Sequence, residues 1–145
     1  MLQRLERFLR DQVLLGLGSF LEVRLYAALA IGFSAWLLPA PASVVPWTKL
    51  ALFALYEEIV FRMLLQEGLH SLLRRRFLTG GLSLANAGAS LVFALAHLVH
   101  HPPGWALAVL LPSLVFGWAW DRYKSLLPCA LLHFVYNFLF FYRTY

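Results

Sequence analysis

Five apolar segments make up most of this chain, and turn-forming residues separate them. Proline and glycine stand in the breaks, as is typical of loops between helices. Several segments are shorter than the roughly 20 residues of a typical membrane-spanning helix, which indicates a thin bilayer or helices that begin among the headgroups. We therefore predict an all-α, polytopic transmembrane helix bundle of about five spans, over Val13–Leu38, Leu50–Leu73, Leu82–Val99, Trp105–Trp120 and Leu126–Phe141.

The first dozen residues precede these segments and have an amphipathic pattern. Apolar residues recur at helical spacing with arginines between them: Leu2, Leu5, Phe8 and Leu9 alternate with Arg4, Arg7 and Arg10. Two interpretations stay open. The segment is an amphipathic helix lying on an anionic membrane surface, or a basic flank that fixes the orientation of the first span.

Composition favours a membrane protein over a soluble one. Hydrophobic residues make up 61% of the 145 residues and charged residues 13%, against roughly 45–50% and about 25% in soluble domains. A soluble protein of this size lacks the interior to bury so much apolar surface, whereas in a bilayer the outside of the helices can also be apolar. The length fits a single domain, residues 1–145.

The distribution of charge predicts an orientation rather than a nucleic-acid partner. The net charge of +5 comes from short basic clusters between apolar runs, which is the pattern of membrane anchoring. With the N-terminus inside, eight basic residues lie on the inner side and two on the outer: Arg4, Arg7, Arg10, Arg74, Arg75, Arg76, Arg122 and Lys124 against Lys49 and Arg143. We expect a cytoplasmic N-terminus.

A glutamate pair and an arginine interrupt the second apolar segment. Ionisable side chains inside a span are costly unless they face a partner or a water-filled cavity, so they are candidates for function. Glu58 and Arg62 are four residues apart on one helical face and can pair. Glu57 is turned about 100° away and can face a different cavity. The alternative is that all three form one buried network for helix packing.

Two further motifs place histidines and an asparagine in apolar helices. His97 follows Phe93 by four residues, and His133 precedes Asn137 by the same spacing. Two hydrogen-bonding side chains one turn apart suit the stabilisation of an oxyanion or the binding of water or a metal. Taken singly, His97 is more often an interfacial histidine, and His133 with Asn137 can serve interhelical hydrogen bonding. In the expected topology these residues and Glu57 meet in the outer half of the membrane.

Other polar residues receive simpler interpretations. His100 and His101 flank a proline pair and are expected to be solvated. Asp121 is expected to form a local ion pair with its neighbours Arg122 and Lys124, and His70 has no predicted partner. The single cysteine, Cys129, excludes an internal disulfide and a zinc site built from several cysteines.

The order of the three motifs resembles the CAAX-protease and bacteriocin-processing (CPBP) family of intramembrane peptidases. They read Glu57-Glu58-Ile-Val-Phe-Arg62, Phe93-Ala-Leu-Ala-His97 and His133-Phe-Val-Tyr-Asn137, and Gln66, Gly117 and Ser125–Pro128 agree as well. The resemblance covers about Leu50 to Phe141, residues 50–141 being the expected catalytic core. It implies an all-helical endopeptidase of a bacterial inner (plasma) membrane.

The resemblance also implies roles. Glu57 would activate the attacking water and His97 would help to hold it. His133 and Asn137 would stabilise the oxyanion, with Glu58 and Arg62 supporting the geometry. A carboxylate and two histidines could hold zinc. We favour a site without metal or other cofactor, because the oxyanion role leaves too few ligands.

The predicted function is therefore cleavage of a membrane-proximal peptide bond in a membrane-anchored peptide or protein, in C-terminal sorting signals or CAAX-like tails. Besides this substrate, the expected partner is the lipid bilayer. One alternative is a non-catalytic membrane partner or bacteriocin-immunity protein of the same architecture. Another is a small proton-coupled carrier, since buried Glu and His also mark ion paths, although no inverted repeat is visible.

Overall fold

The computed structural model describes residues 2–41, 43–78 and 81–143, which form helices joined by loops. In chain order the elements are α1 (Leu2–Ser19), α2 (Val23–Ile31), the 3-10 helix η1 (Gly32–Leu37), α3 (Trp47–Glu58), the π-helix η2 (Ile59–Gln66), α4 (Glu67–Leu72), α5 (Leu84–His97), α6 (Pro103–Tyr123) and α7 (Leu126–Phe141). The predicted all-α class is confirmed.

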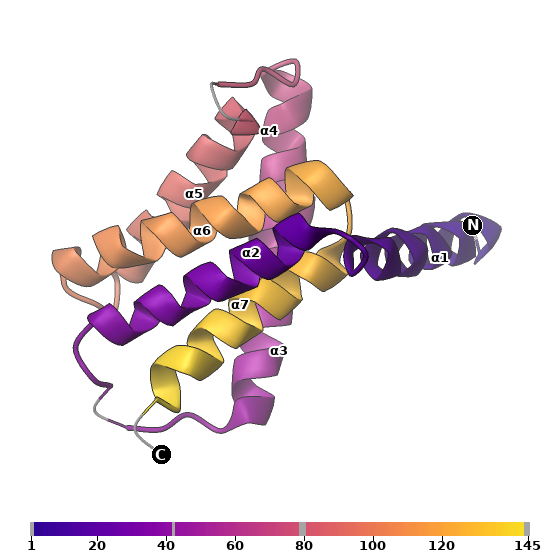
Figure 1. Cartoon of the computed structure of the whole chain (residues 1–145). Coiled ribbons are helices and arrows are strands. Elements are labelled where there is room, and N and C mark those ends of the chain that lie inside the picture. Colours follow the sequence, from indigo (N-terminus) through magenta and orange to yellow (C-terminus); the bar gives the residue numbers. More distant parts are fainter. Residues whose placement is uncertain (1, 42, 79–80, 144–145) are drawn as a thin grey trace.

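The elements α3, η2 and α4 form one continuous helical rod. The residues at both joints keep right-handed helical dihedrals, so the chain runs without a break from Trp47 to Leu72. Figure 1 shows this rod passing behind α6 and α7. The rod ends where Arg74 and Arg75 adopt left-handed backbone angles, with φ of 51° and 50°.

The apolar core lies where α2, α6 and α7 run side by side (Figure 1). Leu25 from α2, Phe116 and Ala119 from α6, and Leu132 from α7 are at most 2% exposed. On the other side of α6, α5 presents Ala85 and other small residues, which lets the backbones of two helices approach closely. This packing holds α6 between α5 and the core residues of α2 and α7.

Only part of the five-span prediction is supported. Among the described residues, Pro103–Tyr123 is long and apolar enough to cross a membrane, and Gln3–Ser19 with Val23–Leu37, bent by 81°, is a second candidate if it counts as one span. The prediction of five spans was wrong for two reasons. α5 and α7 have only 14 and 16 residues, and the rod carries Glu57, Glu58 and Arg62 within its apolar stretch.

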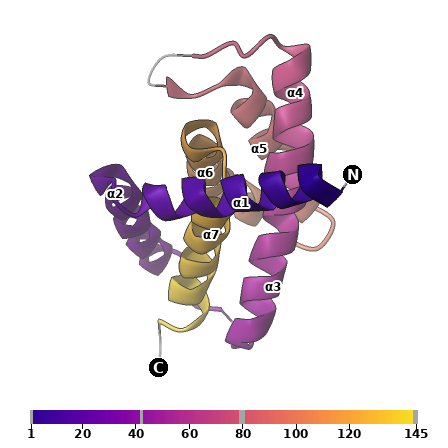
Figure 2. The same ribbon diagram turned by 90° about the vertical axis from the view of Figure 1, so that its right-hand side faces the viewer.

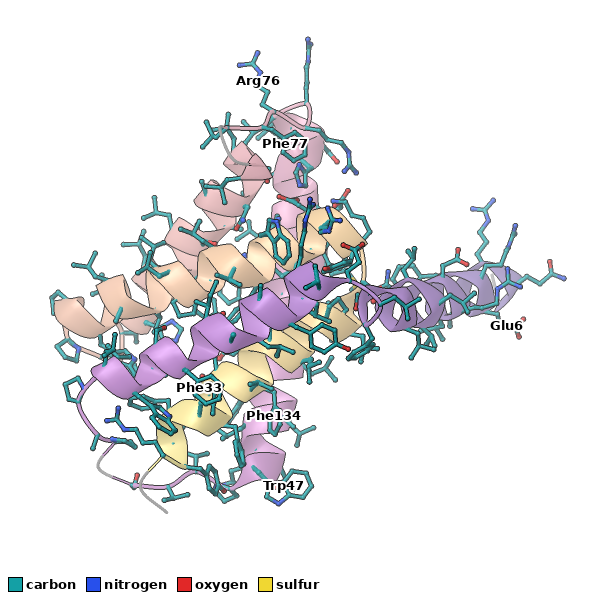
Figure 3. All side chains as sticks on the ribbon, viewed as in Figure 1. Glu6, Phe33, Trp47, Arg76, Phe77 and Phe134 are labelled. Carbon is teal, nitrogen blue, oxygen red and sulfur yellow. The ribbon has the colours of Figure 1, made fainter. Side chains whose placement is uncertain are left out.

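Large apolar side chains nevertheless cover the outside of the helices. Leu52, Leu107 and Leu111 are 68%, 69% and 68% exposed, and Phe33 and Trp47 also reach the surface (Figure 3). Soluble monomers rarely expose contiguous apolar patches larger than a few hundred Å². A surface of this kind suits surroundings of lipid.

The amphipathic start of the chain is a helix, as its pattern predicts. α1 projects away from the other helices in Figure 1 and lies in front of them in Figure 2. Its second half is anchored to the other helices: the Gln12 amide donates to the Lys124 carbonyl at 2.9 Å, and a Cβ at Gly16 would lie 2.8 Å from Leu127. Leu5 and Leu9 are each 53% exposed. Both interpretations of this segment, surface helix and basic flank, remain predictions.

Candidate active site

Four polar side chains form a buried line along the rod. Glu58, Arg62, Gln66 and His70 recur every four residues and are at most 1% exposed; we refer to them as the polar row. In an α-helix a step of four residues turns about 40° beyond one full turn. The π-helix η2, with bonds from i to i+5, has more residues per turn, so four residues there rotate by less than one full turn. The two offsets oppose each other, so the π segment helps keep the row facing α6.

All three guanidinium nitrogens of Arg62 donate hydrogen bonds inside the protein. Nε donates to Glu58 Oε2 at 3.0 Å, and Nη1 donates to Gln66 Oε1 at 3.1 Å and to Ser90 Oγ at 3.4 Å. Nη2 donates to the Ser113 carbonyl and hydroxyl at 2.9 and 2.6 Å. Because five N–H groups find five acceptors, the buried cation is fully satisfied. The predicted Glu58–Arg62 pair is present, with both side chains 0% exposed.

Gly117 on α6 makes room for this arrangement. A Cβ there would lie 1.9 Å from Asn86 Oδ1 and 2.8 Å from Arg62 Nη1. Asn86 is held in place because its Nδ2 donates to the Leu114 carbonyl and its Oδ1 accepts from Ser90 Oγ. The glycine is therefore required by a close approach between α5, the rod and α6.

His133 joins the two glutamates. Its Nδ1 lies 2.8 Å from Glu58 Oε1, and its Nε2 lies 3.6 Å from Glu57 Oε2. The ring stacks on Phe116, with centroids 4.7 Å apart. Since Glu58 is paired with Arg62 and its carboxylate can only accept, Nδ1 carries the proton of that hydrogen bond. The tautomer of His133 is thus set by a residue 75 positions earlier in the chain.

The two adjacent carboxylates differ in their surroundings. The Glu58 side chain is 0% exposed and bound by both Arg62 and His133, whereas the Glu57 side chain is 29% exposed. In the ranges that the structure describes, Glu57 accepts no hydrogen bond and has only the longer contact with His133. Glu57 is therefore the carboxylate available to a water molecule or a substrate.

His97 and Asn137 lie near this pair without touching it. His97 Nδ1 binds the Phe93 carbonyl at 2.9 Å, and the Phe93 ring lies 4.6 Å from His97 and 5.9 Å from His133 between centroids. Because the carbonyl can only accept, the proton is on Nδ1 and Nε2 is left for another partner. Asn137 is half-buried one turn beyond His133, and no hydrogen bond to its amide occurs within residues 2–41, 43–78 and 81–143.

The donor set does not form a metal site. Among the described residues, no group of three or more His, Cys, Asp or Glu side chains is placed to hold an ion. Glu58 and Nδ1 of His133 already bind each other. A catalytic zinc needs three protein ligands with an open position, a set that the described residues do not bring together.

Three residues of the buried network lie outside the predicted site. Gln66 Nε2 donates to Asp121 Oδ1 and to the Gly117 carbonyl, both at 2.9 Å, and His70 Nε2 lies 2.5 Å from the same Asp121 oxygen. The expected local ion pair of Asp121 is present with Lys124 at 3.8 Å, whereas Arg122 pairs with Glu22. The Asp121 side chain is only 4% exposed, and its shorter contacts are those with Gln66 and His70. His70 does have a partner. The sequence did hold a signal for these contacts, since the spacing of four residues continues from Arg62 to His70 and from Ser113 to Asp121.

His100 and His101 are exposed, as expected.

Comparison with known proteins agrees with the three motifs. Residues 39–139 match the family described as Type II CAAX prenyl endopeptidase Rce1-like, a range that includes Glu57, His97, His133 and Asn137. No curated protein and no solved structure matches the chain. The matched range holds the rod, α5, α6 and nearly all of α7, and so the whole candidate site. The chain belongs to the Rce1-like family, the membrane-embedded proteases of the CAAX type.

Proposed function

We propose that the protein is an intramembrane endopeptidase in which Glu57 activates the attacking water. The observation that carries this proposal is the contrast within the glutamate pair. Glu58 is sealed and fully used, whereas Glu57 is 29% exposed and faces His133 Nε2 at 3.6 Å. A general base has to be within reach of its water and free to accept a proton, and of the two carboxylates only Glu57 meets both conditions.

The proposed reaction is peptide-bond hydrolysis with one proton transferred in each direction. Glu57 takes a proton from water as the oxygen attacks the scissile carbonyl carbon. The tetrahedral intermediate then collapses, the C–N bond breaks, and Glu57 returns the proton to the leaving nitrogen. His97 Nε2 helps to hold the water, because Nδ1 is occupied by the Phe93 carbonyl.

His133 and Asn137 stabilise the oxyanion in this proposal. Glu58 accepts from Nδ1 and so leaves Nε2 facing the reacting groups, where Nε2 is a donor to the oxyanion when it carries a proton. The Asn137 amide follows one turn later and has two further N–H groups. Donors already in position where negative charge develops lower the barrier without reorganisation during the reaction.

The proposed substrate is a membrane-anchored peptide or protein cut near the membrane, in a CAAX-like tail or a C-terminal sorting signal. The apolar outer surface supports an enzyme that meets its substrate in the bilayer. We further propose a cytoplasmic N-terminus, because Arg75 and Lys124 both pair with Glu67 at the start of α4, whereas Lys49 lies in the first turn of α3, at the other end of the rod. This orientation would put the site on the outer side of a bacterial plasma membrane.

The test compares Glu57→Gln with a matched control in cells. Glu6 is an exposed carboxylate on the projecting helix α1 (Figure 3), so Glu6→Gln removes the same charge far from the site. New protein N-termini in membranes are quantified by mass spectrometry from cells with the wild type, Glu57→Gln or Glu6→Gln. We expect a set of N-termini that the wild type and Glu6→Gln generate and that Glu57→Gln loses by about 100-fold or more. Persistence of that set with a folded Glu57→Gln protein would contradict the proposal.

A further inference from the structure

A buried chain of hydrogen bonds connects His133 with the far end of the polar row. His133 Nδ1 donates to Glu58, Arg62 donates to both Glu58 and Gln66, and Gln66 donates to Asp121. His70 closes the chain on the same Asp121 oxygen. All of these side chains are at most 6% exposed. The chain therefore runs through the interior of the fold.

In each hydrogen bond of this chain the donor and the acceptor are fixed. Gln66 presents its carbonyl oxygen to the Arg62 cation and its amide nitrogen to the Asp121 carboxylate and the Gly117 carbonyl. A flipped amide would set N–H groups against the guanidinium and an oxygen against two acceptors. Charge alternates along the chain, from Asp121 through Arg62 to Glu58, so each member favours the placement of the next.

The far end is buried with unused hydrogen-bonding capacity. His70 Nδ1 and Asp121 Oδ2 have no partner in the part of the chain that the structure describes. Both donors, from Gln66 and His70, converge on Oδ1 instead. An unpaired buried polar group is destabilising, so a pair kept in this state needs a reason beyond packing. The convergence on one oxygen fixes where Gln66 must point.

We propose that Gln66 and Asp121, with His70, are positioning residues that set the ring orientation and tautomer of His133 through Arg62 and Glu58. This inference rests on the proposed function, since it gives His133 the role of presenting Nε2 to the reacting groups. Asp121 holds the Gln66 amide and Gln66 holds Nη1 of Arg62. Arg62 in turn holds the Glu58 carboxylate against Nδ1. None of the three residues touches the reacting atoms.

The first readout follows His133 itself and needs no substrate. The full chain, purified in detergent with ¹⁵N-labelled histidine, has five histidines, and His133 is assigned from the spectrum that His133→Gln lacks. In the wild type we expect a proton fixed on Nδ1. In Gln66→Met and Asp121→Asn we expect the His133 signal to move toward a mixture of tautomers or to broaden. An unchanged His133 signal in both folded variants overturns the proposal.

The second readout separates positioning from general loss of stability. On a farnesylated peptide ending in Cys-aliphatic-aliphatic-X, we expect each variant to lower kcat about 10-fold with KM changed less than about twofold. The double variant should be no worse than the poorer single variant, because both interrupt one chain. Additive losses, or a change of KM alone, contradict the proposal.

Gly16→Ala serves as the control variant. It crowds Leu127 at the anchor of α1, away from the polar row, and should leave the His133 signal unchanged while lowering stability. A His133 signal that moves equally in this control would show general loosening and overturn the proposal. If the wild type does not cleave the peptide, that result bears on the proposed function alone, and the His133 spectra still decide the positioning role.

Discussion

The two ends of the polar row carry the same pair of residue types in opposite surroundings. At the open end His133 lies 3.6 Å from Glu57, whose side chain is 29% exposed. At the closed end His70 lies 2.5 Å from Asp121, and their side chains are 1% and 4% exposed. Trp120 and Lys124 both donate to Glu67 beside this end at 3.1 Å. A histidine and a carboxylate suit proton transfer where water can enter, and fix geometry where it cannot.

The difference teaches why neighbouring glutamates have unequal tasks. The rod turns Glu57 toward the open end and Glu58 into the row. A buried carboxylate that is fully paired cannot accept another proton without breaking its ion pair, so it serves to orient others. A partly exposed carboxylate can exchange protons with water.

Glu58→Gln should give the largest loss of stability. Without the Glu58 charge the Arg62 cation is buried without a counter-ion, which costs about 3 kcal/mol or more of the free energy of unfolding. Glu57→Gln should change that free energy by less than about 0.5 kcal/mol, because Glu57 accepts no hydrogen bond among the described residues. Denaturant unfolding of both variants in the same detergent measures the difference. Equal losses would erase the contrast between the two carboxylates.

Asn137→Ala should lower turnover about 100-fold and leave folding intact. Its amide would act only on the oxyanion, where the loss of one donor has about this effect. Asn86→Ala is the matched comparison, since Asn86 binds the Leu114 carbonyl and Ser90 inside the fold. We expect Asn86→Ala to lose activity because the protein unfolds at a lower temperature. Thermal unfolding followed by cleavage assays distinguishes the two, and normal turnover in Asn137→Ala would remove this residue from the site.

Gly117→Ala should destabilise the junction of α5, α6 and the rod by about 1–3 kcal/mol, the typical cost of overpacking. The added methyl group would meet Asn86 Oδ1 at 1.9 Å. Gly68→Ala, in the same rod, has nothing within 4 Å and should be neutral or slightly stabilising. Melting temperatures of the two variants check this. Equal melting temperatures would mean that α6 can move away from Asn86 and Arg62 without loss of stability.

Chelation should have the smallest effect. No group of three or more suitable ligands occurs among the described residues, so we expect cleavage to persist after exhaustive dialysis against metal chelators. The measurement is the rate of peptide cleavage before dialysis, after it, and after zinc is added back. A loss that zinc restores would make the open end a metal centre and replace the role given to Glu57.

The sequence by itself determined the helical class, the family and the local pair. The period of four between Glu58 and Arg62 predicts their contact because helical neighbours one turn apart meet whatever surrounds them. The order of the three motifs identified the family, which the match over residues 39–139 confirms. Hydropathy misled on the number of spans, because apolar character reports burial or lipid contact and says nothing of where a helix ends.

Only the tertiary structure decided which polar residues meet. The contact of His133 with Glu58 joins positions 75 apart, and the contact of His70 with Asp121 joins positions 51 apart. Such pairs depend on how α6 and α7 pack against the rod, and on the π segment that helps keep the polar row facing α6. Residue types and spacing identify side chains that need a partner, and the packing of helices chooses the partner, because a buried charge or amide is stable only where a complementary group reaches it.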